Sequence, residues 1–148
     1  MSIVFIEQRI LRAIRGLLTG RVNEILRDME FIIPIIEFGG YGCGYAAVPV
    51  IALTACERSE KERIVRMDAY SLSITFTVPE IPESELYCYT YANAVCKAVS
   101  EDTTLGGVVE RALITGKKYC LPKNPYFGEN WEVIITLRIT IEEMENKN

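Results

Sequence analysis

The sequence predicts an α+β fold: a mainly antiparallel sheet of about five strands, with two principal helices packed on one face and the N-terminal helix first. A helical period of apolar residues opens the chain, strand-like patterns follow in succession, and a second helical pattern interrupts them. Helices and strands therefore do not alternate strictly, which favours a grouped antiparallel sheet over a parallel one. At 148 residues we expect a single domain over 1–148, with flexible last few residues from about 144.

The first helix is predicted over residues 3–19, and Gly20 is expected to cap or kink it, with another turn or two beyond. Apolar side chains recur at the helical period at Ile3, Ile6, Ile10, Ile14, Leu17 and Leu18. Three arginines lie on the other face, at Arg9, Arg12 and Arg15. A solvated face is the favoured interpretation, and a surface that contacts phosphate is the alternative.

Two strands joined as a hairpin are predicted next. The run 31–38 is rich in β-formers but contains Pro34, which cannot donate to a ladder, so this strand should lie at an edge or carry a bulge. Residues 46–54 read as its partner. The glycine-rich loop between them, 39–44, superficially suggests a phosphate-binding loop, but a strand rather than a helix follows it, so a hairpin connection is favoured.

A charged turn is expected over 57–62, followed by a long strand over 63–78. The apolar residues of this strand change from odd to even positions, which predicts a β-bulge near Ala69 and Tyr70. The proline-bearing hairpin over 31–55 and this overlong strand are both natural edges for pairing with another chain.

The second helix is predicted from an N-cap at Ser84 to about Val99. Its stripe of small and medium side chains should pack on the sheet and comprises Cys88, Ala92, Val95 and Val99. Tyr87, Tyr89 and Tyr91 cannot all lie on that stripe, so at least one should be exposed or at an interface.

The stretch from Asp102 to Glu143 completes the predicted sheet. It contains a turn broken by glycines at 103–107, a short strand that runs to a turn at Gly116, a polar loop over 121–130, and a closing strand over 131–141. One face of the closing strand should be core, with Trp131, Val133, Ile135, Leu137, Ile139 and Ile141.

Composition argues against several classes of function. Histidine is absent, which removes the commonest general base and metal ligand, so we predict that the chain is not an enzyme and needs no cofactor. The five cysteines form neither a disulfide framework nor a C-x-x-C zinc motif. No apolar run approaches the roughly 20 residues of a membrane span, and the net charge of −4 argues against a general nucleic-acid binder. We expect a cytoplasmic protein.

The second half of the sequence resembles the tail terminator and head–tail joining proteins of long-tailed bacteriophages, often found in prophages. The resemblance rests on the strand 71–78, the helix with Tyr91-Ala92-Asn93-Ala94-Val95, the segment Asp102-Thr103-Thr104-Leu105-Gly106-Gly107, and a Trp-led closing strand. It covers roughly Tyr70 to Glu143, whereas the first half agrees only in element order. No single invariant motif defines these families.

This resemblance implies a ring of usually six subunits that caps the tail tube, halts its polymerisation and offers a docking face to the head. Its partners would be itself, the tail tube and head-completion proteins, with no membrane, no specific nucleic acid, no catalysis and no cofactor. Such a protein is cytoplasmic in the bacterial host and a virion component when assembled. Other head–tail completion or minor tail proteins remain open as alternatives.

Candidate interface residues come from two segments and one strand. Tyr41 and Tyr45 flank the glycines of the 39–44 loop, and a basic-aromatic segment late in the chain could be a solvated loop or a docking loop for an acidic partner. The candidates are Tyr41, Tyr45, Arg66, Lys117, Lys118, Tyr126 and Phe127, with Lys123 and Tyr119 nearby.

Two other classes compete with the assembly ring. One is a small intracellular ligand-binding module that uses residues 39–45 as a lid over an apolar pocket. The other is a carboxylate-based enzyme, for which the available acids are Asp68, Glu83, Glu85, Glu101 and Asp102. Most of these acids fall in predicted turns or at a helix start, where they commonly serve as caps and dipole partners.

Overall fold

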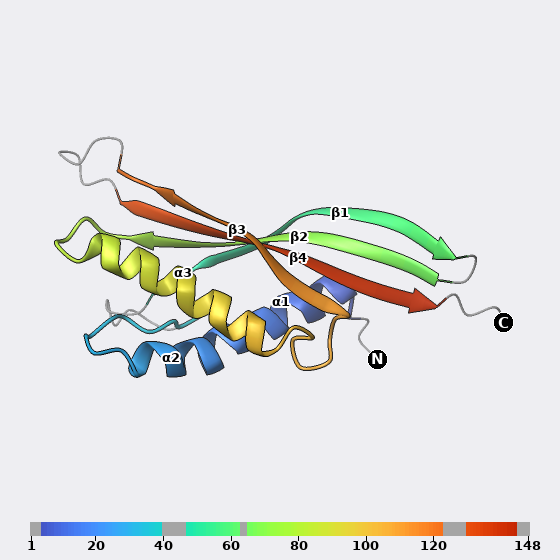
Figure 1. Ribbon diagram of the computed structural model, residues 1–148, viewed down its shortest axis with the longest axis horizontal. Helices are drawn as coiled ribbons and strands as arrows, with labels where there is room; N and C mark the ends of the chain where they lie inside the picture. Colours follow the sequence, from blue (N-terminus) through green and yellow to red (C-terminus); the bar gives the residue numbers. More distant parts are fainter. Residues whose placement is uncertain (1–3, 40–46, 63–64, 123–129, 145–148) are drawn as a thin grey trace.

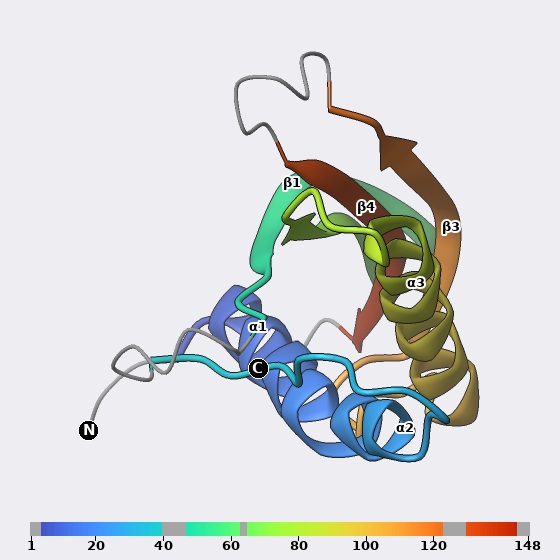
Figure 2. The same cartoon turned by 90° about the vertical axis from the view of Figure 1, so that its left-hand side faces the viewer.

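Four antiparallel strands form one sheet, with helices on one of its faces (Figures 1 and 2). The computed structural model describes residues 4–39, 47–62, 65–122 and 130–144. Within them the strand order is β1-β2-β4-β3, and every neighbouring pair is antiparallel. The strands are β1 (Val50–Glu62), β2 (Val65–Val78), β3 (Arg111–Cys120) and β4 (Trp131–Met144). The α+β class and the antiparallel sheet are confirmed, with four strands in place of about five.

The helical layer contains two long helical stretches. The first consists of α1 (Ile6–Leu17), a π-helical turn (Leu18–Val22) and α2 (Asn23–Arg27), and the second is α3 (Ser84–Glu101). Gly20 lies inside the π-helical turn, so the helix does not end there, although it departs from regular α geometry. Figure 2 shows both stretches beneath the same face of the sheet, while the opposite face carries no helix in the described part of the chain.

The core lies between the helices and the inner face of the sheet. Every side chain of the predicted stripe on α3 is buried, and so is the predicted core face of β4. The Phe76 and Tyr91 rings stack at a centroid distance of 4.6 Å, which fixes α3 against β2. The largest fully buried side chains are Phe76, Ile10, Ile14, Leu18, Leu26, Ile36, Leu72, Ile74, Ile135, Leu137, Ile139 and Val22.

The predicted strand over 31–38 is wrong. Its only bridge in the described residues is a parallel one between Ile36 and Ala47, so the predicted antiparallel hairpin is also absent from them. β1 then begins at Val50 and continues through the predicted charged turn at 57–62. The charged residues at 57–62 belong to this strand and form no turn, because a strand at a sheet edge can expose charged side chains.

The predicted bulge in the long strand is also wrong. β2 pairs with β4 without interruption from Val65 to Val78, and the register shifts opposite it fall on β1, the first of them at Thr54. The apolar phase changes because Asp68 lies on the inner face among apolar residues, where Arg58 binds its carboxylate at 2.8 Å. With β1 on one side and β4 on the other, β2 is central and is not an edge strand.

Gly116 was expected to end a short strand, but it lies within β3. The register of β3 against β4 shifts between Ile114 and Gly116, so Thr115 is an extra residue. Packing is also close here: a Cβ at position 116 would lie 3.2 Å from the Thr136 hydroxyl oxygen, a tight contact that would require the hydroxyl to shift. A bulge at a glycine therefore replaces the predicted turn.

Candidate functional surfaces

Residues 31–38, hereafter the anchored segment, are extended but are held mainly by side chains. The Tyr87 hydroxyl donates to the carbonyl of Ile32 at 2.9 Å, and the Tyr91 hydroxyl donates to that of Pro34 at 2.7 Å. Alternate carbonyls thus face the helices, as they would face a neighbouring strand. This arrangement explains why the segment has a strand-like sequence without being part of the sheet.

Asn23 makes the third and deepest attachment. Its Nδ2 donates to the Ile36 carbonyl at 2.7 Å, and its Oδ1 accepts the Ile36 N–H at 2.7 Å. Asn23 is 3% exposed and Ile36 is 2% exposed, so solvent does not compete for these bonds. A side-chain amide can satisfy both backbone groups of one residue, which makes asparagine suited to this position.

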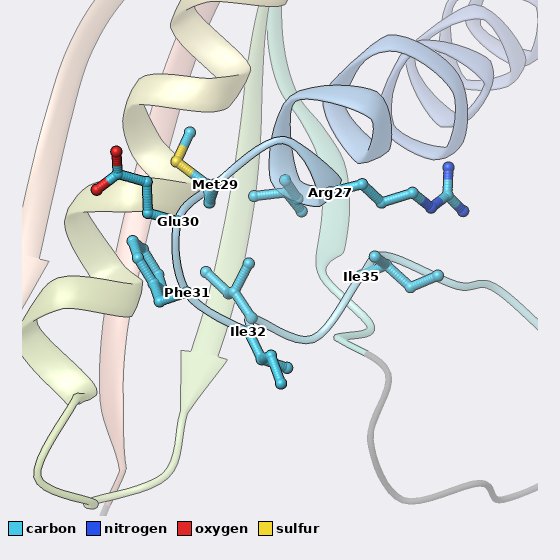
Figure 3. Close-up of a pocket in the computed structure, with 8 residues that line it drawn as sticks. Arg27, Met29, Glu30, Phe31, Ile32 and Ile35 are labelled. Atoms are coloured by element: carbon cyan, nitrogen blue, oxygen red, sulfur yellow. The ribbon is translucent and has the colours of Figure 1, made fainter.

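A hollow of about 320 Å³ opens where α2 meets the anchored segment (Figure 3). In Figure 3, Met29 and Phe31 lie on the α3 side of the loop, and Arg27 points away from it. Ile32 is 92% exposed beside this hollow, the largest exposure among the apolar side chains described. Its lining residues are Leu26, Arg27, Met29, Glu30, Phe31, Ile32, Ile33 and Ile35. The volume is at the small end for ligand pockets.

The titratable groups beneath the anchored segment are held in their neutral forms. Burial raises the pKa of the Cys88 thiol to about 11, and the nearby carboxylate of Glu85 adds to the shift. Burial also raises the pKa of Tyr91 above its ordinary value, so its hydroxyl remains a donor to Pro34. These shifts favour a structural role for both side chains.

The predicted basic-aromatic loop begins in a strand. Lys117 and Tyr119 lie on the inner face of β3, where the Lys117 ammonium donates to Asn93 at 3.3 Å and Tyr119 packs edge-on against Tyr89. Lys118 lies on the outer face, exposed. The two lysines therefore do not form one patch. Tyr41, Tyr45, Lys123, Tyr126 and Phe127 lie outside the described residues.

The remaining candidates are separated in the fold. Arg66 lies near the start of β2, paired in register with Glu60 and Glu143. Arg21 binds Glu101 at 3.1 Å, and Asp102 accepts the N–H of Gly106 at 2.9 Å. Glu83 and Glu85 are exposed at the start of α3. Among the described carboxylates, the five acids proposed for an enzyme do not converge on one site.

The predicted turn at 103–107 closes one end of the core. Leu105, at φ 50°, is 5% exposed, and Gly106 and Gly107 follow with positive φ values of 73° and 85°. Left-handed backbone is costly for residues with a Cβ and is readily adopted by glycine, which accounts for the Gly-Gly pair in the sequence. This turn also supplies the Thr103 carbonyl that accepts the N–H of Ala112, covering the first part of the β3 edge.

The edges of the sheet were predicted only in part: the expected edge hairpin over 31–55 overlaps the start of β1, whereas the edge at β3 was not predicted. β1 and β3 are the outermost strands in the described residues, and each exposes apolar side chains: Val48 and Val50 at the start of β1, Leu113 and Leu121 on or beside β3. An outer-face hollow of about 370 Å³ next to β3 is lined by Met67, Glu110, Arg111, Leu113, Arg138 and Thr140. The run of β-forming residues around Val48 and Val50 was the available sequence signal for β1.

No group of metal-ligating side chains gathers within the described ranges, and none of the helices there is long and apolar enough to span a membrane. Neither a protein-family model nor a curated protein matches this chain.

Proposed function

We propose that this chain is a structural subunit of a phage or prophage particle, a tail-terminator-like ring protein that caps the tail tube and joins it to the head. The observation that carries the proposal is the pair of unlike open edges, β1 and β3, on opposite sides of one long sheet. A ring built by head-to-tail contacts needs two different surfaces on each subunit, whereas a two-fold dimer needs only one.

The resemblance of residues 70–143 adds support. This stretch spans most of β2, all of α3 and β3, and nearly all of β4, which share one core. The resembling half therefore contains most of the sheet and its core helix. Its strands pair with one another, and the one strand from outside it that joins the sheet is β1, which pairs with β2.

The test combines mass and binding. Multi-angle light scattering over a range of concentrations should give a species near six times 16.7 kDa, about 100 kDa, either alone or once tail tubes are added. Co-sedimentation with purified tail tubes should show saturable binding at tube ends. A strict monomer at high concentration that also fails to bind tubes would overturn the proposal.

A ligand-binding module is the second candidate, supported by the apolar hollow at the anchored segment. It predicts that a small apolar ligand raises the melting temperature in proportion to its occupancy of the native state. This candidate would be favoured over the ring if a ligand from a screen raises the melting temperature of the protein and the protein stays monomeric with and without tail tubes.

A further inference from the structure

We propose that neighbouring copies of this chain join by antiparallel pairing of β1 of one copy with β3 of the next, so that the sheet continues across the subunit boundary. This inference rests on the proposed ring and names the surface that builds it. The described part of the chain places no strand beyond either edge, so no described strand pairs the outward backbone groups of β1, or those of β3 beyond Ala112, whose N–H bonds Thr103.

The strand directions permit this contact. β1 and β3 are first and last in a four-stranded antiparallel order, so they run in opposite directions. A copy that lays its β3 beside β1 of another therefore continues the antiparallel alternation. Because the two edges differ, the contact is heterologous and can propagate around a ring.

The exposed apolar residues select a register. Antiparallel pairing brings the start of β1, where Val50 is 65% exposed, beside the end of β3, where Cys120 lies on the same outer face; Leu121 then falls opposite Pro49 on the other face. Placing Val50 opposite Cys120 keeps outer-face residues together, since Val50 pairs with Thr75 and Cys120 with Glu132 on that face. This register covers side chains that are otherwise solvated.

The irregular positions fit the same register. It brings the extra residue of β1, Thr54, close to the extra residue of β3, Thr115. Each extra residue changes the face of the residues that follow it, so outer-face residues of the two strands again lie opposite one another past these positions. Glu57 then falls opposite the exposed Leu113 and diagonal to Arg111, an attractive cross-strand charge arrangement. The Thr103 bond to Ala112 sets the limit of the pairing, which spans 50–57 on one copy and 113–120 on the next.

Disulfide trapping tests the pairing directly. Directly opposed antiparallel residues have Cα atoms about 4.5–5.5 Å apart, within reach of a disulfide. Val50→Cys should therefore link to the native Cys120 of a neighbour under mild oxidation. Each chain contributes two different positions, so non-reducing gels should show a ladder that extends beyond the dimer. Ala52→Cys tests the register shifted by two residues, which also keeps the faces matched.

Three controls separate the possible outcomes. All variants carry Cys56→Ser, which removes the exposed native thiol of β1. In that background Val50→Cys combined with Cys120→Ser should lose the ladder, and Ser100→Cys, an exposed thiol on α3, should not form one. A product that stops at the dimer and survives Cys120→Ser would indicate symmetric β1–β1 contacts and overturn the inference. A wild-type ring whose Val50→Cys and Ala52→Cys variants give no ladder would overturn it while leaving the proposed function intact. A protein that stays monomeric and does not bind tail tubes would overturn both the strand pairing and the proposed function.

Discussion

Replacement of Asn23 by alanine should be among the most damaging polar substitutions in this chain. The change removes both partners of the Ile36 backbone, whose N–H and carbonyl each bond the Asn23 side chain at 2.7 Å. Because Ile36 is 2% exposed, water cannot easily replace them. A buried polar group left without its partner costs about 1–3 kcal/mol.

The loss of partners for the N–H and the carbonyl of Ile36 sets the expected change in the free energy of unfolding. Alanine has the higher helix propensity by roughly 0.5 kcal/mol, which offsets a little of the loss. We therefore expect Asn23→Ala to lower the free energy of unfolding by about 2–4 kcal/mol. With a urea m-value near 2 kcal/mol/M, the unfolding midpoint should fall by roughly 1–2 M. Equilibrium urea unfolding followed by far-UV circular dichroism measures this shift.

Asn93→Ala is the matched control. Asn93 is also helical and bonds a carbonyl four residues earlier, that of Tyr89, but it is exposed, so its replacement should change stability by less than about 0.5 kcal/mol. Asn23→Leu separates polar from packing roles, since it restores volume without the amide. The reasoning is refuted if Asn23→Ala unfolds at the same urea concentration as Asn93→Ala, or if Asn23→Leu matches the wild type.

Two further predictions concern the thiol of Cys88 and the glycine turn. Because the pKa of Cys88 is about 11, only about one thiol in a thousand would be ionised at pH 8, and its side chain is fully buried. Iodoacetamide should therefore label the exposed Cys56 in the native protein and leave Cys88 unlabelled until denaturant is added. Mass spectrometry of tryptic peptides checks this, and equal native labelling of the two cysteines would contradict it. Gly106→Ala should destabilise the protein by about 1 kcal/mol because its φ is +73°, whereas Gly16→Ala, in open space within α1, should be neutral or stabilise it by up to about 1 kcal/mol. Thermal unfolding compares the two variants, and shifts of the same sign would count against the backbone explanation.

The helices and the central strands could be predicted because their signals are periodic and local. The stripe on α3 and the alternation of β4 each report one buried face, and both faces are buried as expected. Of the three tyrosines on α3, Tyr89 is the one left 45% exposed. The glycine pair at 106–107 marked a turn because left-handed backbone is costly for other residues.

Positions that depend on distant partners could not be predicted. Asp68 interrupts the apolar pattern of β2 only because Arg58, ten residues away, neutralises it on the neighbouring strand. The candidate basic surface fails because Lys117 and Lys118 lie in β3 and not in a loop, and adjacent residues of a strand point to opposite faces. Which of the two faces the helices follows from the extra residue Thr115 and the register of β3 on β4.

The anchored segment shows how a correct local inference can produce a wrong element. Its β-forming residues do favour extended backbone, and the backbone is extended. What sequence periodicity cannot specify is the partner, and here the hydroxyls of Tyr87 and Tyr91 and the amide of Asn23 take the place that a neighbouring strand would fill. Since side chains of the helical layer satisfy this segment, it does not add to the sheet. Within the described residues β1 is therefore the outer strand on its side of the sheet, and its edge is the one that the proposed pairing assigns to a second copy.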